Sequence, residues 1–140
     1  MTAKADVRSS RVLEVFPYLC VRNASAAMDF YAAVFGAEEI TRMEDGGRIV
    51  HAEMRLGPIT LMLADELPEY GIVSPQSVGG TGTTLHLHVS DVDSMVAMAV
   101  ARGAVVLRGP SDEPHGERQC RLRDPFGHEW LLGHDLRASP

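Results

Sequence analysis

The sequence predicts an α+β protein made of two similar βαβββ modules in one domain. Two observations support this prediction. Each half of the 140-residue chain contains the pattern of one strand, one amphipathic helix and three strands, and a glycine ends the helix in both halves. The segments just before the two helices, residues 21–23 and 89–91, lie half a chain apart, which an internal duplication explains.

The first module is expected over residues 12–64. Residues 12–21 are apolar and rich in β-formers, which predicts a strand that tolerates Pro17 at a sheet edge. Asn23 is a suitable N-cap for a helix over residues 23–35, where apolar side chains recur at helical spacing, and Gly36 is a typical helix stop. Three further strands are predicted over residues 38–43, 48–56 and 59–64.

The second module is expected over residues 83–136, after a linker rich in proline and glycine over residues 65–82. Residues 83–89 alternate as a strand, Asp91 can cap a helix over residues 92–102, and Gly103 is placed to end it. Strands are predicted over residues 104–107, 118–123 and 128–132. A tail over residues 1–11 precedes the domain, and residues 137–140 form a second tail.

The composition excludes several classes of protein. Hydrophobic residues at 45% and charged residues at 23% are typical of a folded globular chain. A formal net charge of −6 would repel a phosphate backbone, so we expect no nucleic acid partner. Neither a signal peptide nor a membrane-spanning apolar run is visible, and the two cysteines have no C-x-x-C spacing. We therefore expect a cytoplasmic protein with no membrane partner.

The alternation of the strands divides their side chains between two faces. Apolar positions are expected to pack on the helices, which leaves the opposite face to solvent or a ligand. The His-x-His pair of the second module projects both imidazoles from that opposite face, a spacing that can bind a metal ion. The side chains predicted on the face away from the helices are Phe16, Tyr18, His51, Glu53, Thr84, His86, His88, Arg121 and Leu131.

Several short motifs resemble the vicinal oxygen chelate superfamily, which includes glyoxalase I, extradiol dioxygenases, fosfomycin-modifying enzymes and bleomycin-binding resistance proteins. The chain looks most similar to the PhnB-like branch of that superfamily. The resemblance implies a glyoxalase/bleomycin-resistance-like fold in which the concave faces of the two sheets enclose a ligand cleft, and it implies a homodimer. The motifs are Phe16-Pro17-Tyr18-Leu19, Phe30-Tyr31, Val34-Phe35-Gly36-Ala37, His51-Ala52-Glu53, Asp91-Val92-Asp93 and Asp124-Pro125-Phe126-Gly127-His128.

The resemblance also implies where a metal ion would bind. Its metal-using members take His or Glu ligands from the first and last strands of each module, and the matching positions here are Phe16, Leu61, Thr84 and Leu131. Three of these side chains are apolar and one is a hydroxyl, so we expect no metal cofactor at these positions. The alternative is a divalent metal ion held by His86 and His88, with His51 or Glu53 completing the site.

Two functions remain open from the sequence. The first is a small-molecule-binding protein, as in antibiotic sequestration, that holds an apolar or aromatic ligand. The second is a lyase, isomerase or dioxygenase-type enzyme that uses an unconventional metal site or acid–base catalysis by His51 and Glu53. Arg121, with the neighbouring Glu117 and Arg118, either holds an anionic ligand group or pairs at the surface. The predicted ligand-binding residues are Phe16, Tyr18, His51, Glu53, Leu61, Thr84, His86, Arg121 and Leu131.

Overall fold

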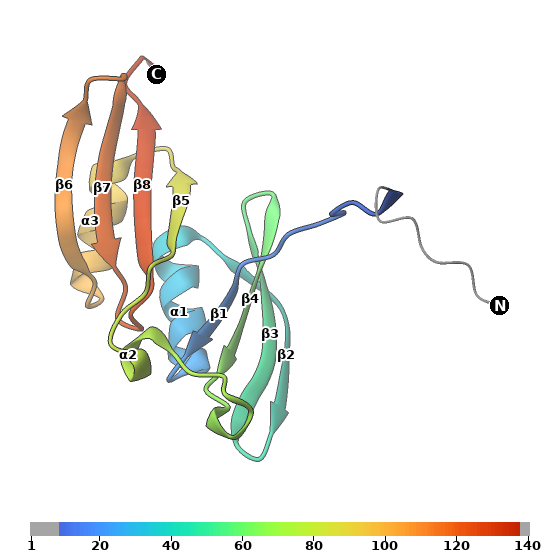
Figure 1. Cartoon of the computed structure of the whole chain (residues 1–140). Helices are drawn as coiled ribbons and strands as arrows, with labels where there is room; N and C mark the ends of the chain where they lie inside the picture. The colour runs from blue at the N-terminus through green and yellow to red at the C-terminus, as the bar shows by residue number, and fades with distance from the viewer. Residues whose placement is uncertain (1–8, 138–140) are drawn as a thin grey trace.

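The computed structural model describes residues 9–137, so most of the predicted tails lies outside it. The chain folds as strand, helix and three strands, twice over (Figure 1). The first module consists of β1 (Tyr18–Val21), α1 (Ala24–Phe35), β2 (Glu38–Asp45), β3 (Arg48–Leu56) and β4 (Ile59–Asp65). The second consists of β5 (Thr84–His88), α3 (Val92–Ala101), β6 (Val105–Glu113), β7 (Glu117–Arg123) and β8 (Glu129–Asp135).

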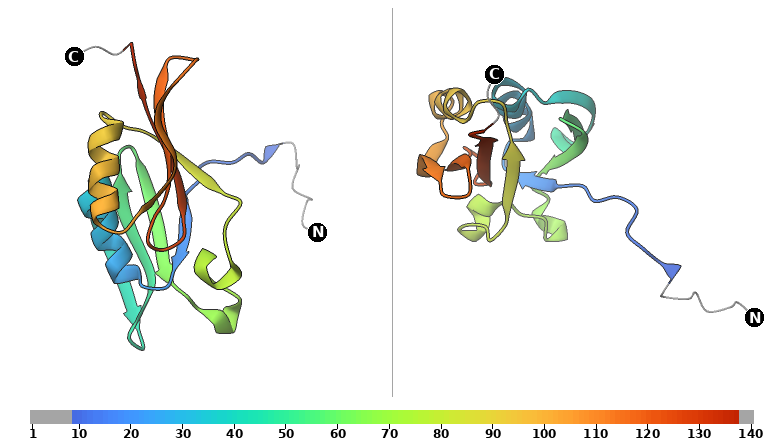
Figure 2. Two further views of the ribbon diagram at one scale, coloured as in Figure 1. Left: turned by 90° about the vertical axis from the view of Figure 1, so that its left-hand side faces the viewer. Right: turned by 90° about the horizontal axis from the view of Figure 1, so that it is seen from above.

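Each module forms a four-stranded sheet with the same topology. The strand orders are β1-β4-β3-β2 and β5-β8-β7-β6, and in each sheet the first strand runs parallel to the last. The two helices lie side by side on one side of the molecule (Figure 2). The predicted α+β architecture with two βαβββ modules is therefore confirmed. Within residues 9–137, no helix has the length and apolar character needed to cross a membrane.

Local signals place the helix ends within a residue or two of the prediction. The side chain of Asn23 accepts a hydrogen bond from the backbone N–H of Ala26 at 3.0 Å, and Asp91 caps α3 in the same way through Ser94 at 3.3 Å. Gly36 has a φ of 72° and donates its N–H back to the carbonyl of Ala32. Glycine adopts this left-handed conformation at little cost, which explains why the helix ends there.

Three segments differ from the sequence prediction. Only residues 18–21 of the predicted first strand are a strand, because Pro17 has no N–H to donate, and the chain before it extends away from the sheet (Figure 1). The predicted linker contains two short helices, η2 (Pro68–Tyr70) and α2 (Pro75–Val78). The edge strand β6 continues past Gly109 and Pro110, beyond the predicted strand end at residue 107, because shifts in register accommodate both residues.

A shared core joins the two modules. Trp130 of β8 is fully buried, and its ring centroid lies 5.5 Å from that of Tyr31 and 4.7 Å from that of Phe35, both on α1. The buried carboxylate of Asp124 accepts hydrogen bonds from the Tyr31 hydroxyl and the Trp130 indole N–H. Because this core covers the helix side of both sheets, the opposite faces carry the half-exposed polar side chains.

Candidate functional site

The first polar group lies on the sheet of module one, on the face away from the helices. Tyr18 Oη is 2.7 Å from Nδ1 of His51, and Nε2 of His51 is 2.8 Å from Oε2 of Glu53. An ionised carboxylate only accepts, so a neutral imidazole here donates from Nε2 and accepts the phenol hydrogen bond at Nδ1. Burial, and then the nearby Glu53 carboxylate, raise the pKa of Tyr18. The three side chains form a relay suited to proton transfer.

The second group lies on the equivalent face of module two. Arg121 donates a hydrogen bond from Nη1 to the Thr84 hydroxyl at 2.6 Å, and Leu131 is the strand partner of both His86 and Arg121. A small cavity of about 70 Å³ opens beside them. Its lining residues are Arg108, Gln119, Arg121 and Leu131.

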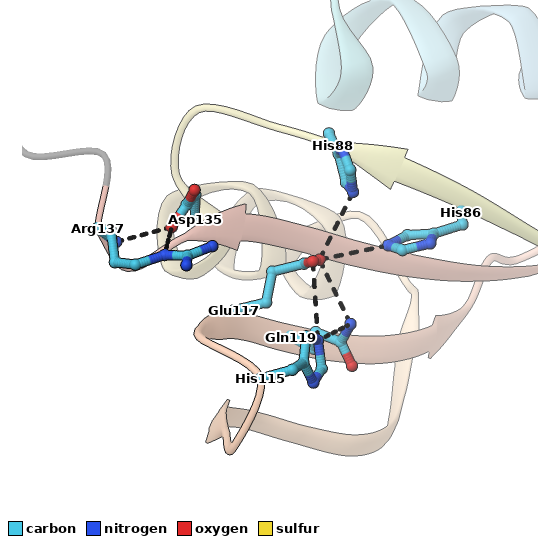
Figure 3. Close-up of polar contacts among 7 residues, drawn as sticks. All are labelled: His86, His88, His115, Glu117, Gln119, Asp135 and Arg137. Atoms are coloured by element: carbon cyan, nitrogen blue, oxygen red, sulfur yellow. Dashed lines mark hydrogen bonds and ion pairs between the residues drawn. The ribbon is translucent and has the colours of Figure 1, made fainter.

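The third group surrounds Glu117, at the start of β7. Oε1 of Glu117 lies 3.5 Å from Nε2 of His86 and 3.6 Å from Nε2 of His88, and Oε2 lies 3.7 Å from Nε2 of His115. Gln119 donates its side-chain N–H to Oε1 at 3.3 Å (Figure 3). The hydrogen bond from Gln119, followed by the proximity of His88, His86 and His115, lowers the pKa of Glu117.

A pocket of about 620 Å³ lies along the edge strand β5, between the tip of the β3–β4 hairpin and the end of α1. This volume is within the range that holds drug-sized ligands. Most of the lining is hydrocarbon, and the polar side chains in it are two imidazoles and one serine hydroxyl. The lining residues are Phe35, Leu56, Gly57, Pro58, Ile59, His86, Leu87, His88, Val89, Ser90 and Met95.

The structure distributes the predicted site residues over these separate groups. His51 and Glu53 do contact each other. His86 and His88 instead lie beside Glu117 of their own sheet, in module two. Of the predicted ligand-binding residues, only His86 lines the pocket beside β5.

The prediction for Leu61 is wrong. Its side chain is 0% exposed and belongs to the helix-side core, together with Leu63 on the same strand. The strand register pairs Tyr18 with Met62, so it is Met62 that shares the outer face with Tyr18. Leu61 therefore points away from any cleft between the outer faces, because neighbouring residues of a strand alternate between faces.

Sequence reasoning singled out the histidine pair but missed its partner. From the sequence, Glu117 is expected only as a neighbour of Arg121, in an anion-holding group or a surface pair. A signal existed in Gly133, a glycine inside strand β8, because such a glycine often marks a close approach across a sheet. A Cβ atom on Gly133 would lie 2.1 Å from Oε1 of Glu117 and 3.3 Å from Nε2 of His86.

Comparison with known proteins agrees with this architecture. The profile that describes the Glyoxalase/Bleomycin resistance protein/Dioxygenase superfamily matches residues 11–132. An uncharacterized protein of Mycobacterium bovis is 39% identical over 125 residues, which are 86% of this chain and 82% of that protein.

Two solved structures show the same fold. A gene product of Arabidopsis thaliana has a TM-score of 0.70 and 26% identity, over 87% of this chain and 98% of that one. TnmS3, an antibiotic binding protein from Streptomyces, has a TM-score of 0.65 and 22% identity, over 90% of this chain and 98% of that one.

Proposed function

The chain belongs to the Glyoxalase/Bleomycin resistance protein/Dioxygenase superfamily, and from that premise we propose that it is a small-molecule-binding protein whose ligand is apolar or aromatic. The observation that carries this proposal is the pocket of about 620 Å³ beside β5. Leu56, Pro58, Ile59 and Met95 give it hydrocarbon walls, and His86 offers a hydrogen bond at its rim. The fold is compatible with this role, since TnmS3 is an antibiotic binding protein.

The proposed binding does not use the metal positions that the resemblance implies. Three of those four positions carry Phe16, Leu61 and Leu131, none of which has a donor atom, and Leu61 lies in the core. The fourth, Thr84, accepts a hydrogen bond from Arg121. We therefore expect ligand binding to persist after treatment with a chelator.

A homodimer in the cytoplasm is part of the same proposal. The arm before β1 carries apolar side chains that the described residues 9–137 leave uncovered: Leu13 is 84% exposed, and Val12, Val15 and Phe16 are exposed as well. A second copy that covered this arm would remove apolar surface from water, which favours association. With such a partner, the predicted ligand cleft would lie between the two copies, beside the sheet face that carries Tyr18. The two free cysteines suit a reducing compartment.

The pocket is tested with a fluorescent aromatic probe, 1-anilinonaphthalene-8-sulfonate, and chelator-treated protein. Ile59→Asp places a charge in the apolar wall, and because Ile59 is 39% exposed, the folding cost is small. The matched control is Ile40→Asp, on β2 and 47% exposed. We expect probe binding that weakens by at least about tenfold in Ile59→Asp and is unchanged in Ile40→Asp. Equal affinities in the two variants, or no binding to the natural protein, would contradict the proposal.

The contact chain of Tyr18, His51 and Glu53 favours one alternative, an enzyme that works by proton transfer. A His–Glu pair positions an imidazole for general acid–base catalysis. A compound found by its binding to the protein separates the two functions. Recovery of that compound unchanged supports a binding protein, whereas conversion by the natural protein and not by His51→Ala supports the enzyme.

A further inference from the structure

Two histidines of β5 and one glutamate of β7 bring their metal-binding atoms together on the outer face of module two (Figure 3). Nε2 of His86 and Nε2 of His88 lie 3.5 and 3.6 Å from Oε1 of Glu117, and all three atoms lie within 4.8 Å of one another. In a tetrahedral zinc site with bonds of about 2.0–2.1 Å, neighbouring ligand atoms are roughly 3.4 Å apart. The two distances to Glu117 are therefore already close to the spacing of a zinc ligand set, and the ligand atoms of the two histidines lie within 4.8 Å of each other.

Gly133 creates the space in which these side chains meet. Strand β8 lies between β5 and β7, so the Glu117 side chain must cross β8 to reach the histidines. It crosses at Gly133, the strand partner of His88, where a Cβ atom would lie 2.1 Å from Oε1 of Glu117. The space that the Glu117 carboxylate occupies therefore depends on the glycine at position 133 of β8.

The Glu117 carboxylate is available to bind a cation. Within the described part of the chain, its ion-pair partners are imidazoles only. The arginines of the same sheet pair elsewhere: Arg118 contacts Asp93 and Asp112, and Arg121 contacts Thr84. Neutral imidazoles and an ionised carboxylate are the protonation states that bind a metal ion.

We propose that His86, His88 and Glu117 bind one divalent cation, and that Zn²⁺ is the best match to this donor set. Two imidazoles and one carboxylate with a remaining open position form a known zinc coordination pattern. Gln119, which donates a hydrogen bond to Oε1 of Glu117 at 3.3 Å, orients the carboxylate, and His115 lies 3.7 Å from its second oxygen. The bound ion would lie at the rim of the pocket beside β5, since His86 and His88 also line that pocket. The proposal does not depend on the small-molecule ligand.

The experiment titrates Zn²⁺ into untagged, chelator-stripped protein and measures binding by calorimetry. We expect one Zn²⁺ per chain, with a dissociation constant that rises at least tenfold in Glu117→Gln and in His88→Ala. His88 is 75% exposed, so its removal leaves the fold intact. His51→Ala is the matched control, because His51 also contacts a glutamate but lies on the other sheet. Its affinity for Zn²⁺ should equal that of the natural protein.

Gly133→Ala tests the geometry without removal of a ligand. The new methyl group meets the mobile end of the Glu117 side chain, so the strand should fold and the carboxylate should be displaced. We expect weaker Zn²⁺ binding together with an unchanged circular dichroism spectrum. Absence of Zn²⁺ binding at millimolar concentration would overturn the proposal. It would also be overturned if Glu117→Gln or His88→Ala bound Zn²⁺ as tightly as His51→Ala.

Discussion

Replacement of Tyr31 by phenylalanine should weaken the connection between the two modules. Asp124, in the turn before β8, is 3% exposed and accepts four hydrogen bonds. Oδ2 accepts from the Tyr31 hydroxyl at 2.5 Å and from the Trp130 indole at 2.8 Å, and Oδ1 accepts from the backbone N–H groups of Phe126 and His128 at 2.8 and 3.1 Å. Burial and the Asp124 carboxylate raise the pKa of Tyr31, so its hydroxyl remains a donor at neutral pH. Tyr31 is the member of this group that comes from module one.

The expected cost follows from what each substitution leaves behind. Tyr31→Phe deletes one hydrogen bond to a charged acceptor and keeps the ring contacts, while Asp124 retains three donors. Such a bond contributes about 1.5–3 kcal/mol, so we expect a loss of about 2 kcal/mol. Asp124→Ala leaves the Tyr31 hydroxyl and the Trp130 N–H buried without an acceptor. Each unsatisfied group costs about 1–3 kcal/mol, and with the two backbone donors the total should exceed about 4 kcal/mol.

Urea unfolding measures these losses. Trp130 is the only tryptophan of the chain and lies at the contact between modules, so its fluorescence reports on that contact. Circular dichroism follows the helices as an independent probe. The exposed Tyr70 provides the control substitution Tyr70→Phe, which should change the free energy of unfolding by less than about 0.5 kcal/mol. A Tyr31→Phe protein as stable as this control would refute the reasoning, because the hydrogen bond from Tyr31 to Asp124 would then contribute nothing measurable to the connection between the modules.

Two further predictions concern a thiol and the oligomeric state. Burial, followed by the nearby Glu66 and Asp65 carboxylates, raises the pKa of Cys20 to about 11. At pH 8 the Cys20 thiol of the folded protein should therefore react with iodoacetamide on the order of a hundredfold more slowly than free cysteine. A reaction rate in the folded protein equal to the rate in urea would contradict this. The exposed arm around Leu13 predicts a homodimer. Light scattering at micromolar concentration should therefore return twice the mass of the chain. The mass of a single chain would count against a dimer.

The sequence alone determined the parts of this protein that depend on near neighbours. A cap such as Asn23 acts on a backbone group three residues away, and Gly36 ends a helix through its own backbone conformation, so both signals can be read from a short window. The alternation of β3 likewise placed His51 and Glu53 on one face, because side chains two residues apart in a strand always share a face. Repetition of these local patterns then predicted two modules.

Strand register was decided only by the tertiary structure. Leu61 was assigned to the cleft by analogy, but the pairing of Tyr18 with Met62 turns Leu61 toward the helices. A shift of one residue exchanges the two faces of a strand, and register depends on hydrogen bonds between distant segments. For the same reason the sequence showed the turn at Asp124 but not the hydrogen bond from Tyr31, which is 93 positions away.

The candidate metal site shows both contributions. The spacing of His86 and His88 already places two imidazoles on one face of a strand. The third ligand, Glu117, comes from a strand that is not adjacent to β5, and it reaches the histidines only because Gly133 has no side chain on the strand between them. Which carboxylate completes the set therefore depends on the order of strands in the folded sheet, since residues far apart in the chain become neighbours only when the sheet has formed.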